Sequence, residues 1–181
     1  MTQGKPYKNL TFKPLATTDI PLIYKWFNTP HVNKWWSING YVNPSLHAVS
    51  DKYVKRINFE ESVFCHIVYF DNNPVAYIQW YRVSDFEESI ALVPDSNNKA
   101  GIDIFIGESD YLYRGLGPVI IKRYISEVIF EESDIQGCII DPEPKNKAAI
   151  RAYEKAGFKY KYTKRNQHSD VDAYIMELQK D

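Results

Sequence analysis

Hydrophobic and polar positions along the chain follow two periods, and the period of two indicates the strands. Alternation in residues 10–15 predicts a first strand, and two runs rich in β-branched and aromatic residues predict strands at 63–70 and 75–83. The four residues between those two runs, Asp71-Asn72-Asn73-Pro74, are typical of a hairpin turn. Other apolar runs predict strands at 101–106, 137–140, 158–164 and 171–178.

Apolar residues three or four positions apart predict four helices between these strands. The first follows capping residues at 17–19 and ends before Pro30, the second starts at Pro44, the third spans 116–130 and the fourth follows Asn146. The residues expected to face inward are Ile20, Ile23, Tyr24 and Phe27 in the first helix, Leu46, Val49, Tyr53 and Ile57 in the second, Ile120, Ile121, Tyr124, Ile125 and Val128 in the third, and Ala149, Ile150 and Tyr153 in the fourth.

The order of these elements predicts the class of fold. Along the chain it is β-α-α-β-β-β-α-β-α-β-β, which gives an α/β (α+β) protein with a mixed, mostly antiparallel central sheet and helices on both faces. Segments 31–43 and 84–100 have no clear period and are expected to be irregular. With 181 residues and no repeat or linker, residues 1–181 are expected to form a single domain.

Composition indicates a folded, aromatic-rich chain. Hydrophobic residues make up 44%, including 14 Tyr, 9 Phe and 4 Trp, which argues against disorder. A formal net charge of −1 gives no reason to expect nucleic acid as a partner. Cys65 and Cys138 lie in apolar runs, as reduced structural cysteines do, and a disulfide is the less favoured interpretation.

The chain shows no targeting or membrane signal. The first nine residues lack the apolar core of a signal peptide, and no stretch is long enough to span a bilayer. We therefore expect a cytoplasmic protein without a membrane partner. For the oligomeric state, a monomer and a dimer both stay open.

Two runs with glycines are the most informative motifs. In residues 146–158, Asn146 is a strong helix N-cap, and Gly157 supplies the positive φ that ends a helix before an apolar strand resumes. Some thirty residues upstream, Arg114-Gly115-Leu116-Gly117-Pro118 opens another amphipathic helix. A glycine-rich helix start offers free backbone N–H groups to an anion, although such a glycine pair can also serve only to turn the chain.

Together the two runs resemble the acyl-coenzyme A site of the GCN5-related N-acetyltransferases, the GNAT superfamily. The resemblance implies the GNAT fold, acetyl-CoA as co-substrate, and Tyr153 as the group that donates its proton to the departing sulfur. From periodicity alone, Tyr153 is as readily a core aromatic. The residues implied to bind the cofactor are Arg114, Gly115, Leu116, Gly117 and Pro118 at the pyrophosphate, the backbone of Ile104, Phe105 and Ile106 along the pantetheine arm, and Asn146, which is also a cap.

Pro118 departs from the family pattern. The family usually has a small residue two positions after the second glycine, where this chain continues with Pro118 and Val119. Proline has no N–H to give, although it fits the first positions of a helix. We therefore expect fewer backbone donors at the pyrophosphate.

Acetyl transfer to nitrogen requires a neutral amine, so the site needs a group that takes or relays a proton. Asp103 is the best candidate, because a carboxylate within an apolar strand needs a partner or a function. A salt bridge to Lys99 or Arg82 is the alternative. Residues 83–113 contain seven acidic residues and a single base, Lys99. Such a segment would attract a polycationic acceptor, whereas the simpler interpretation is a solvated acidic loop.

The resemblance narrows to one branch, the aminoglycoside 6'-N-acetyltransferases, and spans nearly the whole chain. Shared runs, in order, are His31-Val32-Asn33-Lys34-Trp35-Trp36, Gly101-Ile102-Asp103, Asp141-Pro142-Glu143-Pro144-Lys145-Asn146 and residues 153–158. It implies acetylation of a polycationic aminoglycoside, with resistance as the result. It further implies Asp103 as base and acceptor ligand, and acceptor contacts from Trp36, Gln79, Glu88, Asp141 and Asp170, of which Glu88 and Asp170 lie in variable segments.

Other interpretations stay open beside this one. The Trp35-Trp36 pair could be a core or interface pair. The enzyme could acetylate a different amine, such as a siderophore hydroxylysine or a polyamine, or the chain could be a non-catalytic acyl-CoA-binding module. None of the four histidines has a second ligand at zinc spacing, and no Gly-x-Ser-x-Gly or Walker pattern occurs. We therefore expect no metal and no covalent enzyme intermediate.

Overall fold

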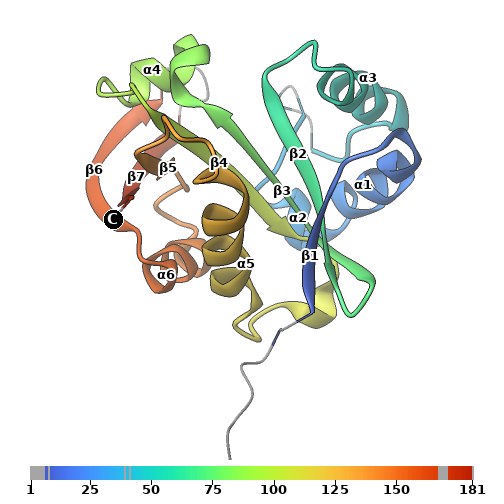
Figure 1. Ribbon diagram of the computed structural model, residues 1–181. Coiled ribbons are helices and arrows are strands. Elements are labelled where there is room, and N and C mark those ends of the chain that lie inside the picture. Colours follow the sequence, from blue (N-terminus) through green and yellow to red (C-terminus); the bar gives the residue numbers. More distant parts are fainter. Residues whose placement is uncertain (1–6, 8, 39, 41, 167–170, 181) are drawn as a thin grey trace, which may run out of the picture. The chain divides into compact units, whose positions relative to one another are not determined.

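The computed structural model describes residues 7, 9–38, 40, 42–166 and 171–180 (Figure 1). The chain forms two compact units. Unit 1 consists of Met1–Gln79 and Ile104–Leu116, and unit 2 of Trp80–Asp103 and Gly117–Asp181.

Seven strands form a mixed sheet, as the order of elements predicts. The strands are β1 (Leu10–Pro14), β2 (Val63–Phe70), β3 (Asn73–Arg82), β4 (Lys99–Ile106), β5 (Gly137–Ile140), β6 (Lys159–Asn166) and β7 (Val171–Gln179). Their order in the sheet is β1-β2-β3-β4-β5-β7-β6. β1 pairs antiparallel with β2 and β7 antiparallel with β5 and β6, whereas β4 and β5 are parallel.

The four predicted helices are present, and two short ones join them. The α-helices are α1 (Ile20–Phe27), α2 (Pro30–Asn33), α3 (Leu46–Ile57), α4 (Glu87–Leu92), α5 (Leu116–Tyr124) and α6 (Lys147–Ala156). Turns of 3-10 helix occupy Thr17–Asp19, Val83–Asp85 and Ser109–Tyr111, and a π-helical turn follows α5 at Ile125–Ile129. No helix in the described part of the chain combines the length and apolar character needed to cross a bilayer.

The short helices α2 and α4 correct the expectation that segments 31–43 and 84–100 are irregular throughout. Pro30 stands at the first position of α2, where its fixed φ suits a helix. The last carbonyls of α4 find partners on β6: the Tyr162 hydroxyl donates to Leu92 O at 2.9 Å, and Lys164 Nζ donates to Ala91 O at 2.5 Å. These long-range bonds stabilise a helix too short to form on local propensity.

The core of unit 1 is aromatic. Helices α1 and α3 pack against each other and α3 packs on β2 (Figure 1). Between them lie the fully or nearly fully buried rings of Trp26, Phe27, Tyr53, Tyr77 and Phe105. Two residues that were expected to face inward do not, since Tyr24 is 36% exposed and Leu46 is 48% exposed.

The contacts of Trp26 explain why Tyr24 does not face the core. Trp26 takes the buried position instead of Tyr24, and its Nε1–H donates to the Glu108 carboxylate at 2.8 Å. Its ring also lies over Gly107, where an added Cβ would come within 2.1 Å of the indole. Because a polar partner and a glycine accommodate the indole, the helix turns this face inward.

The third helix differs from its prediction at the end. After Tyr124 the chain makes a π turn in which Phe130 N–H donates to Ile125 O at 2.9 Å, a bond across five residues. The extra residue in this turn rotates the following positions. Ile129 is therefore fully buried, and Val128, which was expected to face inward, is only partly buried.

Candidate active site

The end of the parallel β4–β5 pair brings two carboxyl groups together in unit 2. The paired residues run from Lys99 with Gly137 to Gly101 with Ile139, and the ladder ends there although β4 continues. Asp103 follows Gly101 by two residues and Asp141 follows Ile139 by two, so both point to the same face as the last pair. Both side chains are half-buried.

The electrostatics of Asp141 reflect this neighbourhood. Burial and the nearby Asp103 carboxylate together raise the pKa of its carboxyl to about 7. Because a buried site and an anionic neighbour both disfavour ionisation, Asp141 binds its proton more tightly than an isolated carboxyl group does.

Helix α6 places Tyr153 where the charges of both carboxyl groups act on it. It lies on the buried face of the helix and is 9% exposed. Burial raises the pKa of its hydroxyl, and the charges of Asp103 and Asp141 raise it further. Tyr153 is therefore a protonated donor at neutral pH, within the electrostatic reach of both carboxyl groups.

Local sequence chemistry explains why α6 presents Tyr153 there. The Asn146 Oδ1 accepts from Ala149 N–H at 3.2 Å and caps the helix as predicted. Gly157 adopts φ 108°, in the left-handed region, and ends the helix. The fixed start and end place Ile150, Tyr153 and Ala156 on the buried face.

A small cleft of about 20 Å³ opens beside Asp141. Its lining is mostly apolar, with Asp141 and Ser89 as polar members: Tyr81, Val83, Ser89, Leu92, Val93, Gly101, Ile139, Asp141 and Ile175. The Tyr81 ring lies directly over Gly101, where an added Cβ would come within 2.4 Å of Tyr81 Cζ. Gly101 thus allows an aromatic ring to lie on the same face of β4 that carries Asp103.

Trp36 and Gln79, the two residues of unit 1 predicted to bind the acceptor, both contact Tyr77. The half-buried Trp36 ring lies 5.9 Å from Tyr77 and 4.8 Å from Phe105, both edge to face. The Tyr77 hydroxyl in turn donates to Gln79 Oε1 at 2.6 Å. Arg56 donates to the same oxygen at 2.7 Å. Trp36 is therefore part of the core of its unit as well as a candidate pocket wall.

The glycine-rich loop is open at Gly115. Gly115 has φ 78°, and an added Cβ there would meet no atom within 4 Å, so the loop surface is open. The Tyr7 hydroxyl donates to Arg114 O at 2.7 Å and Leu116 is buried, which holds the loop in place. Pro118 is the third residue of α5. These residues fit a pyrophosphate, which needs N–H donors that side chains do not crowd.

Other predicted positions have distinct surroundings. Ala152 Cβ lies 3.9 Å from the position that an added Cβ would take at Gly117, an ordinary contact. In β4, Ile104 and Ile106 are partly buried and Phe105 is buried. Glu88 lies exposed on α4, and Asp170 lies outside the described residues.

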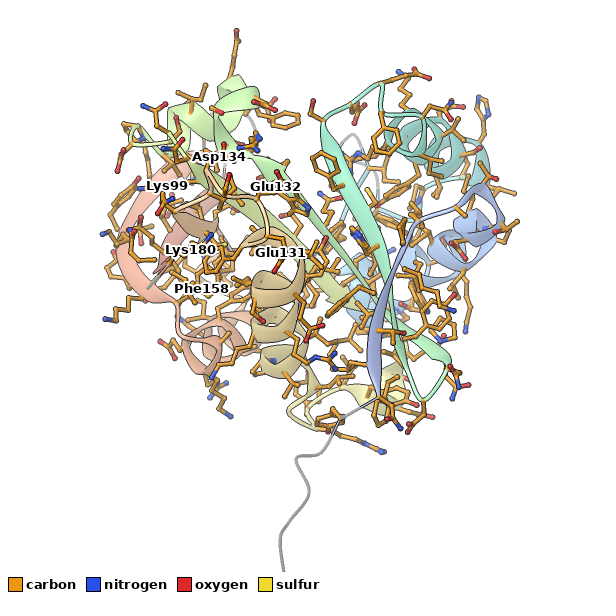
Figure 2. All side chains as sticks on the ribbon, in the orientation of Figure 1. Lys99, Glu131, Glu132, Asp134, Phe158 and Lys180 are labelled. Carbon is orange, nitrogen blue, oxygen red and sulfur yellow. The ribbon has the colours of Figure 1, made fainter. Side chains whose placement is uncertain are left out.

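The two bases considered as salt-bridge partners for Asp103 form ion pairs with other acids. Lys99 Nζ lies 2.9 Å from Asp95 and 2.8 Å from the buried Glu177. Arg82 contacts Asp134 at 2.5 Å and Glu132 at 3.5 Å; Figure 2 labels Lys99 and both of these acids. In the part of the chain that the structure describes, no group of three or more His, Cys, Asp or Glu residues could hold a metal ion.

Four residues contact the predicted site residues, and the sequence analysis did not identify these contacts. Arg56 and Tyr77 hold Gln79, Tyr81 covers Gly101, and His31 Nε2 lies 3.0 Å from Ile106 O. His31 belongs to a run shared with the family, which could have drawn attention to it. The hydrogen bond from Arg56 to Gln79 joins positions 23 residues apart, and no local pattern predicts it.

Comparison with known proteins places the chain among acetyltransferases. It is 28% identical over 150 residues to an aminoglycoside N(6')-acetyltransferase type 1 of Klebsiella pneumoniae, covering 83% of this chain and 74% of that protein. A structure of AAC(6')-Ib with ribostamycin and coenzyme A superposes with a TM-score of 0.81 at 25% identity, over 96% of this chain and 94% of that one. AAC(6')-Ib with coenzyme A and kanamycin gives 0.79 at 26% identity, over 94% and 95%.

The family assignment follows from a sequence profile as well as from these structures. The profile described as "Acetyltransferase (GNAT) domain" matches residues 16–165, which include β4, the glycine-rich loop and α6. The chain therefore belongs to the GNAT acetyltransferase family.

Proposed function

We propose that the protein transfers acetyl from acetyl-CoA to the 6'-amine of an aminoglycoside, and so confers resistance to the antibiotic. The observation that carries the proposal is the convergence of Asp103, Asp141 and Tyr153 at the end of β4 and β5. This arrangement offers a proton acceptor and a proton donor next to each other. The similarity to aminoglycoside N(6')-acetyltransferases over most of the chain supports the choice of acceptor.

The proposed chemistry is a direct transfer. The amine nitrogen forms a bond to the acetyl carbonyl carbon, and the bond from that carbon to sulfur breaks. Asp103 takes the proton of the incoming ammonium, directly or through water. Tyr153, protonated at neutral pH, donates its proton to the departing sulfur, and the second proton that the nitrogen loses as the amide forms restores the Tyr153 hydroxyl. Backbone N–H groups of β4 polarise the carbonyl.

Cofactor binding is assigned to the residues that fit its parts. The loop Arg114, Gly115, Leu116, Gly117 and Pro118 would hold the pyrophosphate through its backbone N–H groups and the Arg114 charge. Pro118 contributes only backbone shape, because it has no N–H. The backbone of Ile104, Phe105 and Ile106 would bond the pantetheine arm as an added strand does. Asn146 would be a further contact beside its role as cap.

The acceptor is a polycation, and the proposed contacts match that chemistry. Asp103, Asp141, Glu88 and Asp170 would bind ammonium groups, and Trp36 would cover a sugar ring. Gln79 would form a hydrogen bond to the acceptor. We further propose that the whole chain acts as one acetyltransferase domain in the cytoplasm, where acetyl-CoA is available.

A thiol-release assay with three acceptors tests this proposal. Kanamycin, hydroxylysine and spermidine are each supplied with acetyl-CoA, and mass spectrometry locates the acetyl group. We expect kcat/KM to be highest for kanamycin, with the product acetylated at the 6'-amine. Higher kcat/KM for spermidine or hydroxylysine would replace the aminoglycoside by that amine. Tight coenzyme binding in calorimetry without turnover of any amine would indicate a binding module instead.

Growth of a sensitive bacterium provides the matching cellular measurement. We expect expression of the protein to raise the inhibitory concentration of kanamycin, and expression of the Tyr153→Phe variant to raise it much less. The phenylalanine keeps the packing of the buried ring and removes only the proton donor. Equal protection by both proteins would remove Tyr153 from the proposed chemistry.

A further inference from the structure

A histidine of α2 holds the end of β4, and the chemistry described so far gives it no role. His31 is half-buried, and its Nε2 lies 3.0 Å from the carbonyl oxygen of Ile106, the last residue of β4. Because a carbonyl oxygen only accepts, Nε2 carries the hydrogen of this bond. The neutral ring can hold its proton on Nε2 and the imidazolium always does, so the bond forms in both protonation states.

The bond from His31 lies on the edge of β4 that points away from β3. The N–H of the next residue, Gly107, donates to Val75 O of β3 at 2.9 Å. Successive residues of a strand direct their backbone groups to opposite edges, so Ile106 O faces away from β3. An extended pantetheine arm that adds to β4 must use this edge, because β3 occupies the other one.

The peptide group between Ile106 and Gly107 is held at both ends. His31 donates to its oxygen, and its N–H donates to Val75 O. The Trp26 indole adds a third restraint, since an added Cβ at Gly107 would come within 2.1 Å of the ring. A planar peptide group fixed in this way leaves the adjoining backbone of β4 little freedom to turn. All five residues belong to unit 1.

Local structure fixes the histidine in turn. Pro30 begins α2 with a φ that suits a helix, and Val32 is 1% exposed, so both neighbours of His31 are constrained. The N–H of Asn33 donates to Thr29 O at 2.9 Å and closes the turn. Helix α2 therefore presents the imidazole to β4 as a donor that is already in place.

We propose that His31 is a positioning residue for acetyl-CoA: by donating to Ile106 O, it holds the edge of β4 in the conformation that binds the pantetheine arm. This inference rests on the proposed function, and within it on the contacts of β4 with the cofactor rather than on the identity of the acceptor. An edge that is already ordered binds more tightly, because binding does not have to order it. Loss of the bond should therefore weaken cofactor binding.

Two substitutions of His31 in the full-length protein differ in whether they keep the bond. The amide nitrogen of glutamine lies as far along its side chain as Nε2 of histidine, whereas that of asparagine reaches only as far as Nδ1. We expect His31→Asn to raise Kd for coenzyme A about tenfold in calorimetry, the loss of one hydrogen bond, and His31→Gln to keep Kd near the wild-type value. A wild-type Kd in His31→Asn, or equal losses in both variants, would overturn the inference.

Amide hydrogen exchange and steady-state kinetics show whether His31 acts through β4. The Gly107 N–H should exchange faster in His31→Asn than in wild type, because its peptide group is then held at one end only. KM for acetyl-CoA should rise about tenfold, while KM for kanamycin keeps its wild-type value. Unchanged exchange at Gly107, or equal rises of both KM values, would show that His31 does not position this edge.

A second histidine provides the matched control. His47 is exposed on α3, where its Nε2 lies 3.2 Å from Asp51, and His47→Asn should change neither Kd for coenzyme A nor exchange at Gly107. If His31→Asn does not fold, His31→Ala takes its place with the same expected result. A wild-type protein that binds coenzyme A but turns over no aminoglycoside would contradict the proposed acceptor alone, whereas wild-type coenzyme binding without the His31 donor would contradict this inference alone.

Discussion

At the scale of single residues, the environment of the candidate site raises the pKa of one carboxyl group, Asp141, and of one phenol, Tyr153. Asp103, Asp141 and Tyr153 lie within electrostatic reach of each other, and burial adds to the effect of their charges. Tyr153 keeps its proton at neutral pH. Asp141 titrates near neutrality because the neighbouring charge and burial both disfavour its anion.

The raised pKa of Asp141 predicts a pH dependence of stability. In the folded protein this pKa is about 7, above the unfolded value near 3.8, so the folded state binds the proton more tightly. The free energy of unfolding should therefore fall as pH rises from about 4 to about 7. Asp141→Asn should remove this slope and raise stability at pH 8 by roughly 2–4 kcal/mol in denaturant titrations.

A surface aspartate provides the matched control for that measurement. Arg82 lowers the pKa of Asp134, so its anion is favoured in the folded state. Asp134→Asn should accordingly leave the slope between pH 4 and 7 in place and should not raise stability at pH 8. A wild-type slope in Asp141→Asn would show that Asp141 does not titrate as described.

At the scale of elements, the first residues of α5 and α6 carry the proposed cofactor contacts. A substitution at each helix start can separate cofactor binding from folding. Gly117→Ala places a methyl group in space where the nearest atom is 3.9 Å away, so the protein should fold as well as wild type. The methyl group would crowd the pyrophosphate, and KM for acetyl-CoA should rise about tenfold in steady-state assays. An unchanged KM would place the pyrophosphate elsewhere.

The N-cap of α6 combines a structural and a proposed binding role. Asn146→Ala removes one capping bond and should cost about 1 kcal/mol of stability in thermal or denaturant unfolding. Ser45→Ala removes the equivalent bond, at 3.2 Å, from α3 and serves as the control. Both variants should lose similar stability, but only Asn146→Ala should raise KM for acetyl-CoA. If KM rises equally in both, Asn146 is a cap alone.

Local patterns predict elements well where the controlling residues are neighbours in sequence. Asn146 and Gly157 fix both ends of α6, and Asp71 and Asn72 adopt the positive φ values that the hairpin requires. The inward position of Ile129 depends on a π turn, which no periodicity encodes. The Arg56 bond to Gln79 depends on how α3 meets β3, which only the folded chain fixes.

At the scale of the whole molecule, charge is nearly balanced, with 22 basic and 23 acidic residues, so any attraction for a polycation is local. We propose that Asp103 and Asp141 supply it, because Asp95 and Glu108 already pair with Lys99 and Lys25. We expect KM for kanamycin to rise several-fold between 0.05 and 0.5 M salt, because ions screen exposed charges. A monoamine such as glucosamine should show a smaller rise; equal rises would argue against local attraction.

The proposed chemistry requires Asp103 to take the proton of the acceptor ammonium during acetyl transfer. The most direct measurement is kcat for kanamycin acetylation by wild type and Asp103→Asn from pH 6 to 9, with unfolding transitions recorded for both. We predict that the variant folds and loses at least about one hundredfold in kcat across this range. A folded Asp103→Asn variant with the wild-type rate and pH profile would contradict the account.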